Sequence, residues 1–122
     1  MGLDQWVYFY PGRQPRSKTN FKIKNEERVE ELFYWRKHYK LDEYMFNEYE
    51  GWGGKKEFNC QKVWLGIDSI NYLKEEILNN KLFDDDLELE DNEKQKEEDL
   101  KFCELAFKKI EQKFVIYYTN WW

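Results

Sequence analysis

The chain has 122 residues, a formal net charge of −5 and a mean hydropathy of −1.02, and 20% of its residues are aromatic. This length corresponds to a single domain, 1–122, with one hydrophobic core. No run approaches the roughly 18 apolar residues of a membrane-spanning helix, and the first residues lack the basic and apolar regions of a signal peptide, so a cytoplasmic protein is expected. Such a polar chain must build its core from a few large rings and leave others at the surface.

The two cysteines and the single histidine are too few for the common four-ligand zinc sites, and no metal or other cofactor is predicted. Cys60 and Cys103 are far apart in the sequence, and we expect both to be buried free thiols, with a disulfide as the alternative. A histidine can activate a thiol when the fold brings the two together, so a catalytic pair of Cys60 and His38 is the enzymatic alternative. No catalytic residue is predicted beyond this alternative, and an enzyme is not the expected function.

The first half of the chain predicts a strand, a basic loop and a helix. Residues 3–10 are rich in the aromatic and β-branched types that favour a strand. Residues 11–24 form a loop with five basic residues and no acid. Rings beside cations suit single-stranded nucleic acid, but the net negative charge opposes it, so direct nucleic-acid binding is not expected. Residues 26–49 follow Asn25, a favourable helix-capping type, and predict one long helix. The apolar stripe is irregular at residues 36–40, so a kink or break there is the alternative.

The second half predicts a strand, two helices and a closing strand. Residues 57–65 alternate imperfectly between polar and apolar and predict a strand, whereas residues 68–79 have the spacing of an amphipathic helix. Residues 82–99 predict an acidic loop that leads into the last helix, in which apolar side chains recur every three or four residues. Asn92 resembles the N-terminal cap of that helix. Residues 114–118 predict the final strand.

Together these elements predict an α+β fold with the order β-α-β-α-α-β. The aromatic strands from the two ends of the chain are expected to pair near the middle of a small mixed or antiparallel sheet. The three helices are expected to pack on one face of that sheet, because each amphipathic helix must cover its apolar stripe.

The acidic segment dominates the charge of the chain. Residues 84–99 contain ten acids and two lysines, so the remainder is mildly basic. A calcium loop of the EF-hand type needs a glycine at its sixth position, which this segment lacks, so a solvated acidic loop is expected. The alternative is a carboxylate patch that imitates the charge of a nucleic acid.

Three short motifs occur in a distinctive order. They are Gly2-Leu3-Asp4 before an aromatic strand, Tyr34-Trp35-Arg36-Lys37, and Tyr117-Tyr118 before Trp121. In this order they resemble a family of small uncharacterised proteins encoded by bacteriophages and prophages. Asn59-Cys60 stands where that family tends to show Asp-Cys. The loop at 11–24 is shorter than in the family and the segment at 82–99 is more acidic, so functions located there need not be shared.

The motif residue Asp4 lies among rings in a predicted strand. An unpaired buried carboxylate costs several kcal/mol, so we expect Asp4 to form a partly buried ion pair with Arg36 or Lys37. The rings expected around this pair are Trp35, Tyr117 and Trp121. The pair has two interpretations: it sets the register of helix and sheet, or it forms a ligand cleft.

The resemblance implies a phage-type protein but no mechanism, and small phage proteins without catalytic motifs most often act by binding a host protein. The expected partner is a component of antiviral defence, such as a CRISPR nuclease, and the expected activity is inhibition. The expected contacts are exposed tryptophans and acidic side chains, namely Trp52, Trp121, Trp122, Asp84, Asp85, Asp86, Glu88, Glu90 and Asp91. Tryptophans dominate interface hot spots, and acids would speed the encounter with a basic surface.

The alternative is a protein that binds a small molecule or nucleotide in the Asp4/Arg36 cleft. The sequence does not determine the oligomeric state.

Overall fold

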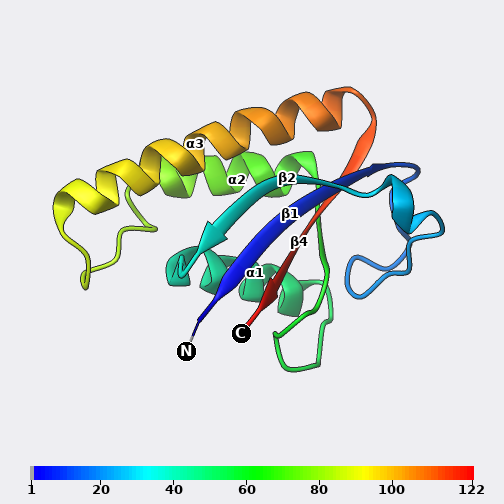
Figure 1. Cartoon of the computed structure of the whole chain (residues 1–122), viewed down its shortest axis with the longest axis horizontal. Coiled ribbons are helices and arrows are strands. Elements are labelled where there is room, and N and C mark those ends of the chain that lie inside the picture. Colours follow the sequence, from blue (N-terminus) through cyan, green and yellow to red (C-terminus); the bar gives the residue numbers. More distant parts are fainter. Residues whose placement is uncertain (1) are drawn as a thin grey trace.

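A four-stranded antiparallel sheet with three α-helices on one face forms the fold in the computed structural model, which describes residues 2–122 (Figure 1). The strand order is β2-β1-β4-β3, with β1 (Asp4–Pro11) and β4 (Phe114–Trp121) at the centre. The edges are β2 (Glu30–Arg36) and β3 (Val63–Leu65). The expected α+β class is therefore confirmed, as is the pairing of the two terminal strands near the middle of the sheet.

The helices follow the predicted order along the chain. They are α1 (Tyr39–Gly51), α2 (Ile67–Leu78) and α3 (Leu89–Glu111). A short 3-10 helix, Glu26–Arg28, precedes β2. No helix in the described part of the chain has the length and apolar character needed to cross a membrane.

The predicted helix at 26–49 is wrong in its first half, which contains strand β2. Phe33 and Trp35 face the helices, whereas Tyr34 and Arg36 alternate with them toward the other side of the sheet. This two-residue alternation in an aromatic run is typical of a strand, and pairing with β1 decides the outcome. Lys37 then adopts a left-handed backbone conformation with a φ of 58°, which separates β2 from α1.

The predicted strand at 57–65 is also too long, because β3 contains only Val63–Leu65. Cys60 has a φ of 62°, a left-handed conformation that interrupts an extended chain. Its backbone N–H donates to the carbonyl oxygen of Asn120 at 2.9 Å. Residues before β3 therefore form a loop that is attached to the end of β4.

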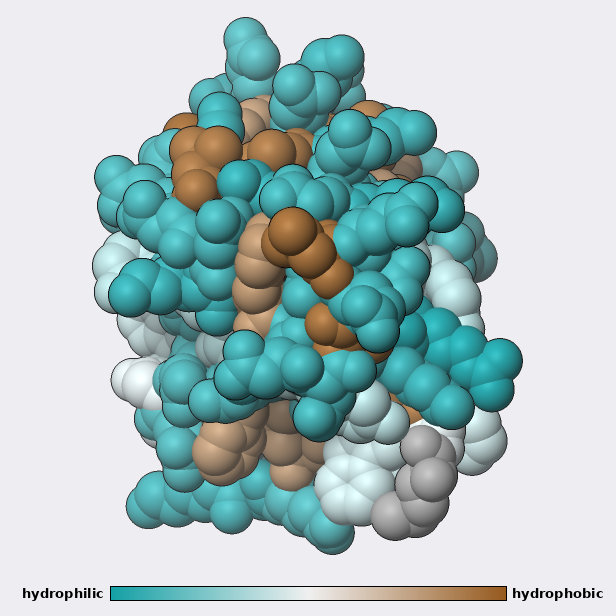
Figure 2. Space-filling model, turned by 90° about the vertical axis from the view of Figure 1, so that its left-hand side faces the viewer, coloured by the Kyte–Doolittle hydropathy of each residue, from teal (hydrophilic) through white to brown (hydrophobic). Residues whose placement is uncertain are grey.

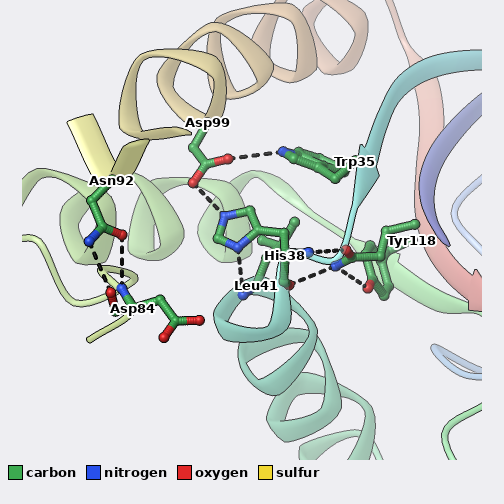
Figure 3. Close-up of polar contacts among 8 residues, drawn as sticks. Trp35, His38, Leu41, Asp84, Asn92, Asp99 and Tyr118 are labelled. Atoms are coloured by element: carbon green, nitrogen blue, oxygen red, sulfur yellow. Dashed lines mark hydrogen bonds and ion pairs between the residues drawn. The ribbon is translucent and has the colours of Figure 1, made fainter. Parts of the chain in front are cut away.

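The acidic segment is only partly a loop, because α3 begins at Leu89 and includes its second half. Asn92 does not cap the helix. Its side chain is buried, and its amide accepts from the backbone N–H of Asp84 at 2.9 Å and donates to the Asp84 carbonyl at 3.0 Å (Figure 3). The loop before α3 is thus closed by a side chain one turn inside the helix.

The two faces of the sheet are covered differently. The helices cover one face over a core that includes Val7, Trp35 and Tyr118. On the other face, which we call the open face, the segment between β1 and β2 covers one end, where Phe21 packs edge-on against Tyr117 with ring centroids 5.5 Å apart. The opposite end of the open face carries exposed side chains, and it holds the candidate site.

Candidate functional site

A buried polar network joins β2, α1 and α3 (Figure 3). The Asp99 carboxylate on α3 accepts from the Trp35 indole N–H at 2.9 Å and bonds to Nε2 of His38 at 2.7 Å. The backbone N–H of Leu41 donates to Nδ1 of His38 at 3.4 Å, so the imidazole proton resides on Nε2. Because His38 and Asp99 are almost fully buried, this network stabilises the fold and is inaccessible to a substrate.

The network continues through the centre of the sheet. The Gln5 side chain bonds to both backbone groups of His38, accepting from its N–H at 2.8 Å and donating to its carbonyl at 2.9 Å. Gln5 also donates to the hydroxyl of Tyr118 at 3.0 Å, and that hydroxyl donates to Asp42 on α1 at 2.6 Å. Every buried side-chain nitrogen and oxygen in residues 2–122 has a hydrogen-bond partner. Side chains from β1, α3 and β4 therefore hold the junction of β2 with α1 in position.

The proposed thiol–imidazole pair is not formed. His38 is bonded to Asp99 inside the protein, whereas Cys60 is exposed in the loop before β3, which corrects the expectation that it is buried. Cys103 is a buried free thiol, and burial, followed by the charge of Asp99, raises its pKa to about 12. Such a thiol is a poor nucleophile. Within the described residues, no three metal-ligating side chains are grouped closely enough to hold a metal ion.

The uncovered end of the open face displays two rows of side chains from three strands. Asp4 pairs with Arg36 on one side and with Trp121 on the other, and Trp6 pairs with Tyr34 and with Thr119. Side chains directly opposite one another in paired strands share a face, as do side chains two residues apart. We call this surface the open-face patch, and its members are Asp4, Trp6, Tyr34, Arg36, Thr119 and Trp121.

The expected ion pair of Asp4 with Arg36 or Lys37 is wrong. Between residues 2 and 122, the ion pairs with a nitrogen–oxygen distance below 4.0 Å are limited to His38 and Asp99. The Asp4 carboxylate instead accepts a hydrogen bond from the Tyr34 hydroxyl. Arg36 is exposed to solvent, where an ion pair gains little free energy.

The rings expected around Asp4 are divided between the faces. Trp35 lies in the core on the helix side, and Tyr117 is on the open face but under Phe21. Only Trp121 joins Asp4 and Arg36 on the open-face patch, with 60% of its surface exposed. The sequence thus identified three members of the patch and missed Trp6, Tyr34 and Thr119. The alternation of these three with core residues was the available signal.

Trp122 belongs to a separate recess on the helix side of the same end of the sheet. We call it the Asp42 recess; its volume is about 330 Å³, and it is lined by Gly2, Leu3, Tyr39, Asp42 and Trp122. The Trp122 indole N–H donates to the carbonyl of Phe58 at 2.8 Å. No local pattern in the sequence singled out Asp42, because its partners come from β4.

Asp42→Asn should increase the free energy of unfolding at neutral pH relative to the wild type. Burial raises the pKa of Asp42, although hydrogen bonds from Tyr118 and Asn120 oppose this shift. The folded protein therefore holds this proton more tightly than the unfolded chain, and stability falls as pH rises from the unfolded pKa through the folded pKa. Urea unfolding of both proteins between roughly pH 3 and pH 7 should show the advantage of Asn growing with pH. An advantage independent of pH would contradict this prediction.

Trp52 lies at the opposite end of α1 from the Asp42 recess. The helix has 13 residues, so its ends are separated by about 20 Å. Trp52 packs edge-on against Trp64, with ring centroids 5.9 Å apart, and both line an open groove of about 550 Å³ beside the start of α2. The expected contacts Trp52 and Trp121 therefore do not form one surface.

The acidic side chains gather around the start of α3, at the end of the molecule seen in Figure 2. That view shows a predominantly hydrophilic surface, with hydrophobic side chains between the polar ones. Five of the six acids expected as contacts are exposed, and the sixth, Asp84, is half-buried. The basic segment between β1 and β2 lies at the other end of the molecule (Figure 1), so the charge is distributed unevenly.

No protein-family model, curated protein or solved structure matches the chain.

Proposed function

We propose that the chain is a non-catalytic binding protein that contacts a partner protein through the open-face patch. The observation that carries this proposal is the gathering of Trp6, Tyr34, Arg36 and Trp121 on the uncovered half of an otherwise packed sheet face. Tyr34 is 44% exposed and Trp121 is 60% exposed, although both strands have a buried side. Tryptophan, tyrosine and arginine are the residue types that most often dominate the binding energy of protein interfaces.

The scaffold under the patch supports the same proposal. The patch lies on two central strands and an edge strand, and the Trp6 and Tyr34 rings contact each other with centroids 5.7 Å apart. Binding by side chains on a rigid sheet loses less conformational entropy than binding by a flexible loop. The hydrogen bond from Tyr34 to Asp4 further orients the tyrosine ring.

A host defence protein, and in particular a nuclease with a basic surface, is the proposed partner, and the expected effect of binding is inhibition. The resemblance of the sequence to phage-encoded proteins supports a host protein. The exposed acids near the start of α3 support a basic one, since opposite charge accelerates association. No observation favours a nucleotide cleft at Asp4 and Arg36, because these residues lie side by side on a sheet surface without an ion pair.

Affinity capture from host-cell lysate tests the proposal when the wild type is compared with variants. Proteins captured by the wild type should be lost with Trp121→Ala and with Tyr34→Ala, because these truncations remove central contacts of the patch. They should be retained with Trp52→Ala, which truncates another exposed tryptophan in the distant groove. Quantitative mass spectrometry of the retained proteins provides the measurement.

Two outcomes would contradict the proposal. Equal capture by all variants would exclude the patch as the interface. If the protein retained nucleic acid only with an intact patch, and nuclease treatment abolished this retention, the partner would be a single strand stacked on the rings instead of a protein.

Replacing Asp85, Asp86, Glu88 and Glu90 by their amides should slow association with the partner at low salt without affecting dissociation. An unchanged association rate would contradict the electrostatic part of the proposal.

A further inference from the structure

The Asp42 recess continues the binding surface around the end of the sheet. Trp122 follows the patch residue Trp121 directly, and Leu3 precedes the patch residue Asp4. The two surfaces are therefore adjacent but lie on opposite sides of the same strand ends. A volume of about 330 Å³ lies within the range of ligand pockets, and the recess combines rings with one carboxylate.

The carboxylate of Asp42 is fixed on one side and available on the other. Its Oδ1 accepts from the Tyr118 hydroxyl at 2.6 Å and from the Asn120 amide at 2.7 Å. Its Oδ2 has no hydrogen-bond partner, and no unpartnered side-chain oxygen among residues 2–122 is buried, so Oδ2 is accessible. Asp42 also forms no ion pair with any cation in that part of the chain. A half-buried negative charge is thus held in position without a positive partner.

Two aromatic side chains form walls beside this carboxylate. Tyr39 is 51% exposed and Trp122 is 39% exposed. Trp122 is held by three hydrogen bonds: its indole N–H donates to Phe58, its backbone N–H donates to the Asn59 side chain, and its carbonyl accepts from that side chain. Its ring is therefore oriented before any ligand arrives. Aromatic faces beside a carboxylate are the chemistry that recognises organic cations.

The fold itself does not need the negative charge at position 42. An asparagine would retain the Oδ1 acceptor for both Tyr118 and Asn120, whereas the carboxylate carries a desolvation cost that burial imposes. Because Tyr118 and Asn120 both donate to Oδ1, an incoming cation approaches from the side of Oδ2. A charge that costs stability and has no cationic partner is typical of a binding position.

We propose that the Asp42 recess receives an arginine side chain of the partner protein. The inference rests on the proposed function, since it identifies one contact of that partner beside the open-face patch. A guanidinium group can stack on the Tyr39 and Trp122 rings while its N–H groups donate to Oδ2 of Asp42. A lysine ammonium group is a compact, strongly hydrated charge that gains less from the ring faces. The exposed acids at the start of α3 lie at the same end of the molecule and favour a basic segment there (Figure 1).

NMR titration with short peptides tests this proposal directly. The probe is the blocked tripeptide Gly-Arg-Gly, and the matched controls are Gly-Lys-Gly and the neutral Gly-Gln-Gly. The Trp122 indole N–H signal, assigned with Trp122→Phe, should shift saturably with the arginine peptide, less with the lysine peptide and not with the glutamine peptide. Asp42→Asn should weaken the arginine peptide by about tenfold, because charge-assisted hydrogen bonds are lost.

Two control variants separate the recess from general charge effects. Glu43→Gln removes the same charge from the next residue of α1, which is exposed and does not line the recess, and it should leave peptide affinity unchanged. A thermal melt of Asp42→Asn establishes that the variant is folded. The proposal is overturned by the absence of a saturable indole shift, by an equal shift with the glutamine peptide, or by unchanged affinity in Asp42→Asn.

The same measurements distinguish this inference from the proposed function. Trp121→Ala alters the other side of the strand ends and should leave binding of the arginine peptide intact while abolishing partner capture. If the arginine peptide binds but capture of the partner does not depend on Trp121, the patch is rejected and the recess is retained. If capture depends on Trp121 but the arginine peptide does not bind, the recess is rejected and the patch is retained.

Discussion

Asp99→Ala should lower the free energy of unfolding by about 2–6 kcal/mol, because each of the two buried donors that it leaves without a partner costs about 1–3 kcal/mol. The Asp99 carboxylate bonds to Nε2 of His38 at 2.7 Å and accepts from the Trp35 indole at 2.9 Å. Both donors are almost fully buried, so alanine would leave each without a partner and without access to water. Urea unfolding followed by circular dichroism measures the loss.

A neighbouring acid on the same helix provides the control for this prediction. Glu98 is exposed, and Glu98→Ala should change the free energy of unfolding by no more than about 0.5 kcal/mol. Trp35→Phe removes only one of the two donors and should cost less than Asp99→Ala. If Asp99→Ala and Glu98→Ala had similar stability, the network would not support the junction of β2, α1 and α3.

Phe102→Ala should cost about 3–5 kcal/mol, since truncating a buried ring removes apolar contact and leaves a cavity. Phe102 on α3 is fully buried and packs edge-on against Trp35, with ring centroids 4.9 Å apart. It also contacts Phe33, at 5.7 Å between centroids. These two rings form the inward side of β2, so the same variant should weaken protection of the β2 amides in hydrogen-exchange measurements.

An exposed aromatic residue provides the comparison for Phe102. Tyr72 on α2 is 58% exposed, and Tyr72→Ala should change the free energy of unfolding by no more than about 0.5 kcal/mol. Phe102 contacts β2 through Phe33 and Trp35, so full protection of the β2 amides in a destabilised Phe102→Ala protein would contradict the packing described above.

The buried network and the Asp42 recess are physically connected. Gln5 joins His38 to Tyr118, and Tyr118 in turn donates to Asp42 in the recess. Burial raises the pKa of Tyr118 well above its ordinary value, so its hydroxyl remains a donor at neutral pH. Side chains held in this way keep a fixed geometry, which lowers the entropy lost on binding.

The sequence by itself determined the class of the fold and most of its elements. Aromatic and β-branched runs predicted β1 and β4, and three- and four-residue spacing predicted α2 and α3. The helices are readable because each has one buried side, so a local period records the position of the core, whereas the strands are readable from their residue types. Composition also required exposed rings, and Trp121 is one of them.

Only the tertiary structure decided the identity of β2 and the composition of both surfaces. Residues 30–36 carry apolar side chains compatible with either period, and pairing with β1 selects the strand. Asp99 and His38 are 61 residues apart, and Asp42 meets Tyr118 across 76 residues, so no local pattern could connect them. Strand pairing placed Asp4 beside Arg36 and Trp121, but it placed them on a solvated face, where an ion pair gains little and exposed rings are available to a partner.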